Sequence, residues 1–211
     1  MSALSTLGQR QQSLLQALLE NKNGLTVDEI SHELTISRNA VNQHLTNLET
    51  NGFIENTSMT DTGGRPSKVY SLSSNGRELF PRHYSLFSNL LLHWIKNKST
   101  EYVFSACLKD LGIQIAQDYK LRVQQQQTRT DKITEVTNIL NELGYEAHTG
   151  ELADSYSEII AKNCVFHQLA EDCNDVCKLD LTLLTSLLQS NVEHKECMVK
   201  GGNCCRFSIT K

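Results

Sequence analysis

The sequence predicts an α+β fold in two compact parts. Three observations lead to this prediction: short helical patterns followed by a hairpin at the N-terminus, long leucine-rich helical patterns in the middle, and alternating strand and helix patterns at the end. A chain of 211 residues, 39% of them hydrophobic, is long enough to form more than one core. The two parts are expected at residues 1–75 and 129–211, and residues 76–128 are expected to be helices that connect them.

The N-terminal part opens with three predicted helices, over residues 11–19, 27–34 and 38–51. Leucines recur at helical spacing in the first. Thr26 and Glu29 form a capping box at the start of the second, and Ser37 is a suitable N-cap for the third. Three short helices joined by tight turns are therefore expected before the first strand.

A β-hairpin follows the third helix. Strand patterns over residues 53–56 and 68–72 flank the Gly-rich loop 62–67. Three helices followed by a hairpin is the order of a winged helix-turn-helix, in which the loop forms the wing.

The third helix has a polar face suited to DNA. Asn, Gln and Arg side chains present paired donors and acceptors that match adenine and guanine edges in the major groove, and a flexible basic wing can approach a groove or phosphates. The alternative is a protein-interaction helix beside an ordinary turn. The residues predicted to contact DNA are Ser37, Arg38, Asn39, Asn42, Gln43, Thr46, Arg65 and Lys68.

The overall charge does not itself indicate nucleic-acid binding. The formal net charge is −4 and the isoelectric point is near 6.0, so a prediction of DNA binding depends on local geometry. The sequence shows neither an apolar run near the roughly 20 residues that cross a bilayer nor a signal-peptide pattern. A cytoplasmic protein that does not bind membranes is expected.

The rest of the chain predicts helices and a small sheet. The helical patterns over 77–95 and 101–127 are rich in leucine and are expected to be central dimerisation helices. The last part is expected to be a small α+β unit with helices on one side of its sheet. Its helices are predicted over residues 131–143 and 179–188, and its strands over 144–147, 157–161, 194–199 and 206–210.

Six of the seven cysteines lie in the last quarter of the chain. In a reducing cytosol, clustered cysteines are more often metal ligands or redox groups than disulfides, and an odd number disfavours full pairing. The absence of any Cys-x-x-Cys pair disfavours a zinc ribbon or finger. Cysteines scattered over loops suit an iron–sulfur cluster, since the cluster's own sulfides fill the centre.

At these cysteines the sequence resembles a known family. The segments 163–170, 177–180 and 197–207 look like the sensor domain of SufR-type repressors, and residues up to about 72 resemble the winged helix of ArsR-type and DeoR-type repressors. The resemblance implies a homodimeric repressor, not an enzyme, that binds an inverted-repeat operator on double-stranded DNA. It also implies control by an iron–sulfur cluster, with [4Fe–4S] favoured over [2Fe–2S].

The ligands that the resemblance implies are Cys164, Cys177 and Cys205, with Cys197 as the fourth. Cys173, Cys204 and His167 are alternatives for the fourth position. His194 could be either a ligand or a structural residue, and Cys107 is expected in a helix core.

Two other functions are weighed against this one. The sensor could instead respond to zinc, haem or thiol oxidation through Cys204 and Cys205. An enzyme with Cys164 activated by His167 is disfavoured, because the sequence shows no oxyanion-type loop and no orienting carboxylate at an evident spacing.

Overall fold

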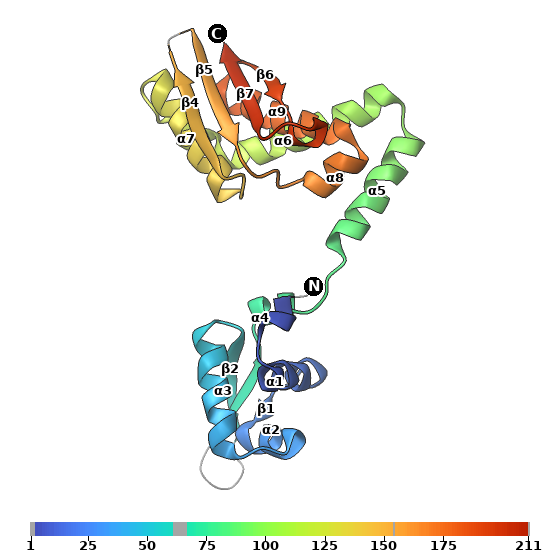
Figure 1. Ribbon diagram of the computed structural model, residues 1–211, viewed down its shortest axis with the longest axis vertical. Coiled ribbons are helices and arrows are strands. Elements are labelled where there is room, and N and C mark those ends of the chain that lie inside the picture. Colours follow the sequence, from blue (N-terminus) through green and yellow to red (C-terminus); the bar gives the residue numbers. More distant parts are fainter. Residues whose placement is uncertain (1–2, 61–66, 154, 211) are drawn as a thin grey trace. The chain divides into compact units, whose positions relative to one another are not determined.

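The computed structural model describes residues 3–60, 67–153 and 155–210 and divides the chain into two compact units, 1–83 and 84–211 (Figure 1). The long helices expected as a separate connecting segment pack within the second unit. Among the described residues, no helix combines the length and the apolar character that crossing a membrane requires.

The first unit is a winged helix-turn-helix, as predicted (Figure 1). Its sheet has the order β1-β3-β2 with antiparallel pairs, and fully buried leucines of α1 and α3 form its core with Ile30 of α2. After the 3-10 turn η1 (Ala3–Thr6), the elements are α1 (Gln9–Glu20), β1 (Leu25–Thr26), α2 (Val27–Leu34), α3 (Arg38–Thr50), β2 (Ile54–Thr60), β3 (Ser67–Leu72) and α4 (Ser74–Glu78).

The predicted capping signals are present. The Glu29 backbone N–H donates to Thr26 Oγ1 at 3.3 Å, and the Thr26 backbone N–H donates to the Glu29 carboxylate at 2.7 Å. This pair satisfies two amide donors that the start of a helix leaves free, and α2 accordingly begins at Val27.

The helix predicted over 77–95 is wrong as a single element. The chain forms the short helix α4, and α5 (Tyr84–Lys98) begins only after Pro81. Proline has no backbone N–H and disfavours helical geometry in the residue before it, which explains the break. Residues 74–76 are the start of α4, where Ser73 accepts from the Gly76 amide at 3.0 Å.

The second unit is a four-stranded antiparallel sheet of order β4-β5-β7-β6, with α6, α7 and α9 packed on one face (Figure 1). Its elements after α5 are α6 (Glu101–Gln124), α7 (Arg129–Glu142), β4 (Ala147–Leu152), β5 (Tyr156–Ala161), α8 (His167–Asp172), η2 (Asn174–Val176), α9 (Cys177–Leu188), β6 (Asn191–Glu196), η3 (Met198–Lys200) and β7 (Cys205–Thr210).

The strand predicted over 144–147 is wrong, because the chain becomes extended only at Ala147. Gly144 and Glu146 have positive φ angles of 94° and 50°, which belong to a turn after α7.

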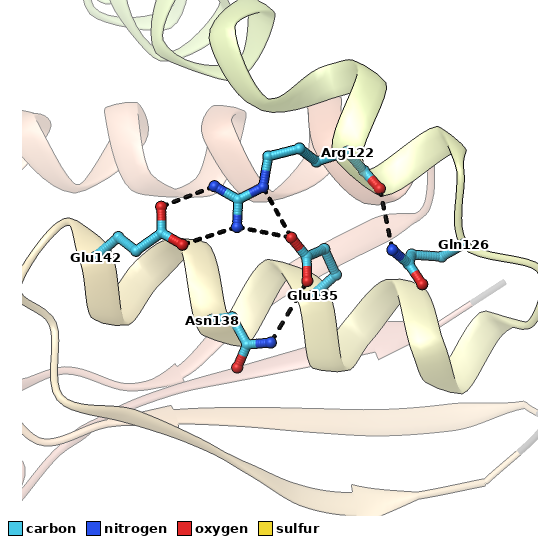
Figure 2. A network of polar contacts seen from close by, with 5 residues as sticks. All are labelled: Arg122, Gln126, Glu135, Asn138 and Glu142. Carbon is cyan, nitrogen blue, oxygen red and sulfur yellow. Dashed lines mark hydrogen bonds and ion pairs between the residues drawn. The ribbon is translucent and has the colours of Figure 1, made fainter.

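Helices α6 and α7 are fixed to one another by an arginine (Figure 2). Arg122 donates to both carboxylate oxygens of Glu142 at 2.7 Å and, through Nε, to Glu135 at 2.9 Å. The guanidinium lowers the pKa of the Glu142 carboxyl. A planar, two-pronged donor fixes direction as well as distance, so the end of α6 is held in register with α7.

Helices α6 and α9 approach closely at Gly112. A Cβ atom at this position would lie 2.6 Å from the Leu179 carbonyl oxygen and 3.0 Å from Thr182 Cβ. Both belong to α9, and backbone atoms cannot move aside as a flexible side chain can. Glycine therefore permits the contact between the longest helix of the unit and α9.

We expect Gly112→Ala to lower the free energy of unfolding by about 1–3 kcal/mol, because the added methyl group overlaps the α9 backbone. Urea denaturation of the full chain measures this. Gln114→Ala, an exposed change two residues away on α6, is the control. Equal stability of the two variants would contradict the close approach.

Candidate functional site: a recognition helix and a thiol pocket

Helix α3 has the division of faces that a recognition helix requires. Its buried stripe is Val41, Leu45 and Leu48, each at most 2% exposed. The Ala40 backbone N–H donates to Ser37 Oγ at 3.2 Å, which fixes the start of the helix. The six residues of this segment that were predicted to contact DNA are all exposed: Ser37, Arg38, Asn39, Asn42, Gln43 and Thr46.

Of the basic residues predicted to contact DNA, Arg38 has an acidic partner and Lys68 is exposed. Arg38 Nε lies 2.5 Å from Asp28 Oδ1 of α2, and both side chains are mostly exposed. Lys68 is exposed on β3. Arg65, which the sequence places in the wing, lies outside the described residues.

Strand register brings three of the predicted ligands to one end of the second unit's sheet. Cys205 is the first residue of β7 and pairs with Ala161, the last residue of β5, three residues before Cys164. Cys197 directly follows β6, whose last residue pairs with Arg206. Because paired strand ends lie side by side, these three cysteines gather although 41 positions separate the first from the last.

Cys177 joins this group from the first residue of α9. Its Sγ, a ring nitrogen of His194 and Cys197 Sγ lie within 4.8 Å of one another. We call Cys164, Cys177, Cys197 and Cys205 the thiol pocket. Three of the four are buried and Cys177 is half-buried.

The pocket disfavours bare thiolates. Burial raises the pKa of Cys164, and it raises the pKa of Cys177 and of Cys205 to about 12. Burial is the largest cause, and repulsion from the neighbouring cysteines and Asp180 also contributes to these raised pKa values. A bound cation would reverse this balance, since thiolate is the form of cysteine that binds metals.

A buried carboxyl lies beside the thiols. Asp180 is 5% exposed, and burial raises its pKa to about 6, although a hydrogen bond from Tyr145 acts in the opposite direction. Tyr145 Oη donates to Asp180 Oδ1 at 2.6 Å. Sequence reasoning missed both residues; the available signal was an aspartate three positions after Cys177 in an otherwise leucine-rich helix.

The other predicted alternatives have partners elsewhere. Lys96 donates to Cys173 Sγ at 3.3 Å, Cys204 donates to Glu196 at 3.2 Å, and His167 Nε2 lies 3.2 Å from Glu171. Cys107 is half-buried rather than in the core as expected.

His194 is placed as a ligand would be. Its ring stacks on Phe207, with centroids 4.6 Å apart. Its Nε2 atom is buried and has no hydrogen-bond partner within the described part of the chain. Burial lowers the pKa of His194, which favours the neutral imidazole that binds metals.

A known protein family matches part of the first unit. Residues 10–59 match the model of a family described as HTH domain. The winged helix-turn-helix and this match define the class of the protein as a DNA-binding transcription regulator, as predicted.

Two solved structures of a Staphylococcus aureus protein are similar to the chain. A mutant of MepR has 18% identity and a TM-score of 0.33, with 65% of this chain and 81% of that chain covered. MepR itself, described as a transcription regulator of the multidrug efflux pump MepA, has 17% identity and a TM-score of 0.31, with 65% and 80% covered. No curated protein sequence is significantly similar.

Proposed function

We propose that the protein is a dimeric repressor that acts in the cytoplasm and whose affinity for an inverted-repeat DNA operator is controlled by an iron–sulfur cluster, with [4Fe–4S] expected. Cys164, Cys177, Cys197 and Cys205 would hold the cluster. The observation that carries the proposal is the convergence of these four thiols, distant in sequence, in a chain that also contains a helix-turn-helix.

The residues of the thiol pocket fit such a cofactor. Thiolates are the usual ligands of iron–sulfur clusters, and this pocket brings four cysteine side chains together. When bound, the cluster would supply iron cations that stabilise the thiolates, and it would make the protein sensitive to oxidants. The chain contributes a partly apolar enclosure, since Cys197 and Cys205 belong to the hydrophobic core of the unit.

Helix α9 provides a connection from the thiol pocket to α6. It begins at the predicted ligand Cys177. Within its first two turns, Leu179 and Thr182 lie against Gly112 of α6. Because packed backbones cannot slide independently, a shift of Cys177 is expected to move α6.

Helix α5 provides a second connection. Lys96 near its end donates to Asp175 at 3.1 Å and to Cys173, and Lys178 of α9 donates to the same Asp175 at 2.7 Å. Asp175 thus joins α5 to the segment that leads into Cys177. Helix α5 begins one residue after the first unit ends at His83, so it is the element through which the sensor reaches the DNA-binding unit along the chain.

The surface of α5 supports a dimer. All fifteen of its described residues are exposed or half-buried, and five large apolar side chains are between 45% and 68% exposed. A helix that is apolar on most sides is normally covered. A second copy, related by a two-fold axis, would also place two recognition helices on an inverted repeat. The five side chains are Leu86, Phe87, Leu90, Leu91 and Trp94.

We expect Cys164→Ser, Cys177→Ser and Cys205→Ser each to abolish the visible absorbance of anaerobically purified protein, because each removes a proposed ligand. Iron and sulfide analysis with electron paramagnetic resonance measures cluster content and nuclearity. Cys107→Ser and Cys204→Ser are the controls and should retain the spectrum. Full cluster content in Cys164→Ser would refute the ligand assignment.

We expect Asn42→Ala or Gln43→Ala to weaken specific binding by about 1–3 kcal/mol, because each removes paired contacts to a base edge. Arg65→Ala in the wing should weaken binding and reduce its dependence on salt. Fluorescence anisotropy with an operator selected from random duplexes measures both effects. Gln16→Ala on the exposed face of α1 is a neutral control, and unchanged affinity in all variants would exclude α3 as the recognition helix.

We expect cluster-loaded protein to bind the operator more tightly than cluster-free protein, with both forms dimeric. Holding Cys164 and Cys177 in fixed positions is expected to restrain α5 and α6. The spacing of the two winged helix-turn-helix units in the dimer would depend on those helices. Gel-shift titration of both forms, with analytical sedimentation in parallel, tests this. Equal affinities would reduce the cluster to a structural role, and a monomeric loaded protein would contradict the dimer.

A further inference from the structure

We propose that the cluster-free protein binds a single divalent metal ion of the zinc class through Cys177, His194 and Cys197. This site is distinct from the proposed iron–sulfur site, although it shares two thiols with it. The inference does not depend on the cluster, since it follows from three side chains and their positions.

The separation of the three ligand atoms suits one ion. Tetrahedral zinc with bonds of about 2.3 Å to sulfur and about 2.0–2.1 Å to nitrogen places its ligand atoms roughly 3.5–3.8 Å apart. The three atoms here already lie within 4.8 Å of one another.

His194 is held in the orientation of a ligand. It lies on β6, its ring stacks on Phe207 of the neighbouring strand β7, and the Glu196 backbone interacts with the imidazole. Metal-binding histidines are commonly fixed in this way, by a contact to the nitrogen that does not bind the metal. Nε2 is left buried and without a hydrogen-bond partner among the described residues.

A buried unpartnered nitrogen needs an explanation in a folded protein. Of the groups near His194, the two thiols are weak hydrogen-bonding partners and good ligands for borderline-soft ions. Mixed sulfur and nitrogen coordination is characteristic of zinc, which binds Cys and His in both structural and catalytic sites. The geometry and the ligand chemistry therefore indicate the same class of ion.

The surroundings give an ion access. A cavity of about 520 Å³ is lined by His194, Cys197, Lys200 and the turn at Gly201 and Gly202, so two of the three ligands border it. The turn is tight, because the Gly202 amide donates to the Cys197 carbonyl at 2.9 Å. The cavity leaves room for a fourth ligand from solution.

Sharing Cys177 and Cys197 makes the two metal states mutually exclusive. A cluster needs Cys164 and Cys205 as well, and the close group of three does not include them. One ion would draw Cys177 toward His194 of β6, whereas a cluster would draw it toward the other three thiols of the pocket. The sensor would then distinguish iron–sulfur loading from zinc loading by the position of the first residue of α9.

The test titrates Co²⁺ into cluster-free, reduced, full-length protein and follows thiolate-to-cobalt charge transfer and the visible bands of tetrahedral cobalt. We expect one Co²⁺ per protomer, displaced by Zn²⁺. His194→Phe keeps an aromatic ring against Phe207 but removes the nitrogen, and should weaken Co²⁺ binding at least about tenfold. The matched control His148→Phe, at an exposed position of β4, should bind as the unchanged protein does.

Equal Co²⁺ affinity in His194→Phe, or no tetrahedral Co²⁺ spectrum in the unchanged protein, would overturn the proposal. X-ray absorption of the zinc-loaded, unchanged protein tests it without any variant: we expect a nitrogen ligand at about 2.0–2.1 Å beside sulfur at about 2.3 Å. A shell of sulfur alone would refute it. Cluster reconstitution in His194→Phe reports on the iron–sulfur proposal separately, because that proposal needs only the four cysteines.

Discussion

The second unit is organised around buried sulfur atoms whose surroundings oppose ionisation. Burial raises the pKa of three thiols of the thiol pocket and of Asp180 beside them. The strand ends, the turn at Gly202 and the start of α9 all serve to bring these groups together. The pocket is part of the main core of the unit, so a change in its charge acts on the packing of the whole sheet and its helices.

The helices around this core differ in how firmly they are packed. Helix α6 is fixed to α7 through Arg122 and to α9 through Gly112, so its two neighbours cannot move independently. Helix α5 differs, because it contacts the sensor through α8 and the pair of Lys96 with Asp175 while most of its apolar surface is exposed. One firmly packed and one sparsely packed helix are compatible with the proposed role of the second unit as a sensor.

Local signals made the first unit predictable, whereas the site in the second depends on tertiary contacts. The capping box at Thr26 and the buried stripe of Val41 and Leu45 can each be recognised from a few neighbouring residues of the sequence. Helix α2 has the predicted bounds. The break before α5 was missed although Pro81 marks it. The environments of His194 and Asp180 were not predictable, because their burial depends on strands and helices distant in sequence. The ligand set and the DNA contacts stay predictions.

The ion pair between Arg38 and Asp28 has a consequence for discrimination between DNA sequences. A backbone phosphate bound to the terminal nitrogens of Arg38 would lie close to the Asp28 carboxylate, which repels it. The chain has a net charge of −4, so its overall charge does not offset that repulsion. If α3 is the recognition helix, this repulsion weakens binding to arbitrary DNA, and the affinity for one operator then depends on the base contacts of Asn42 and Gln43.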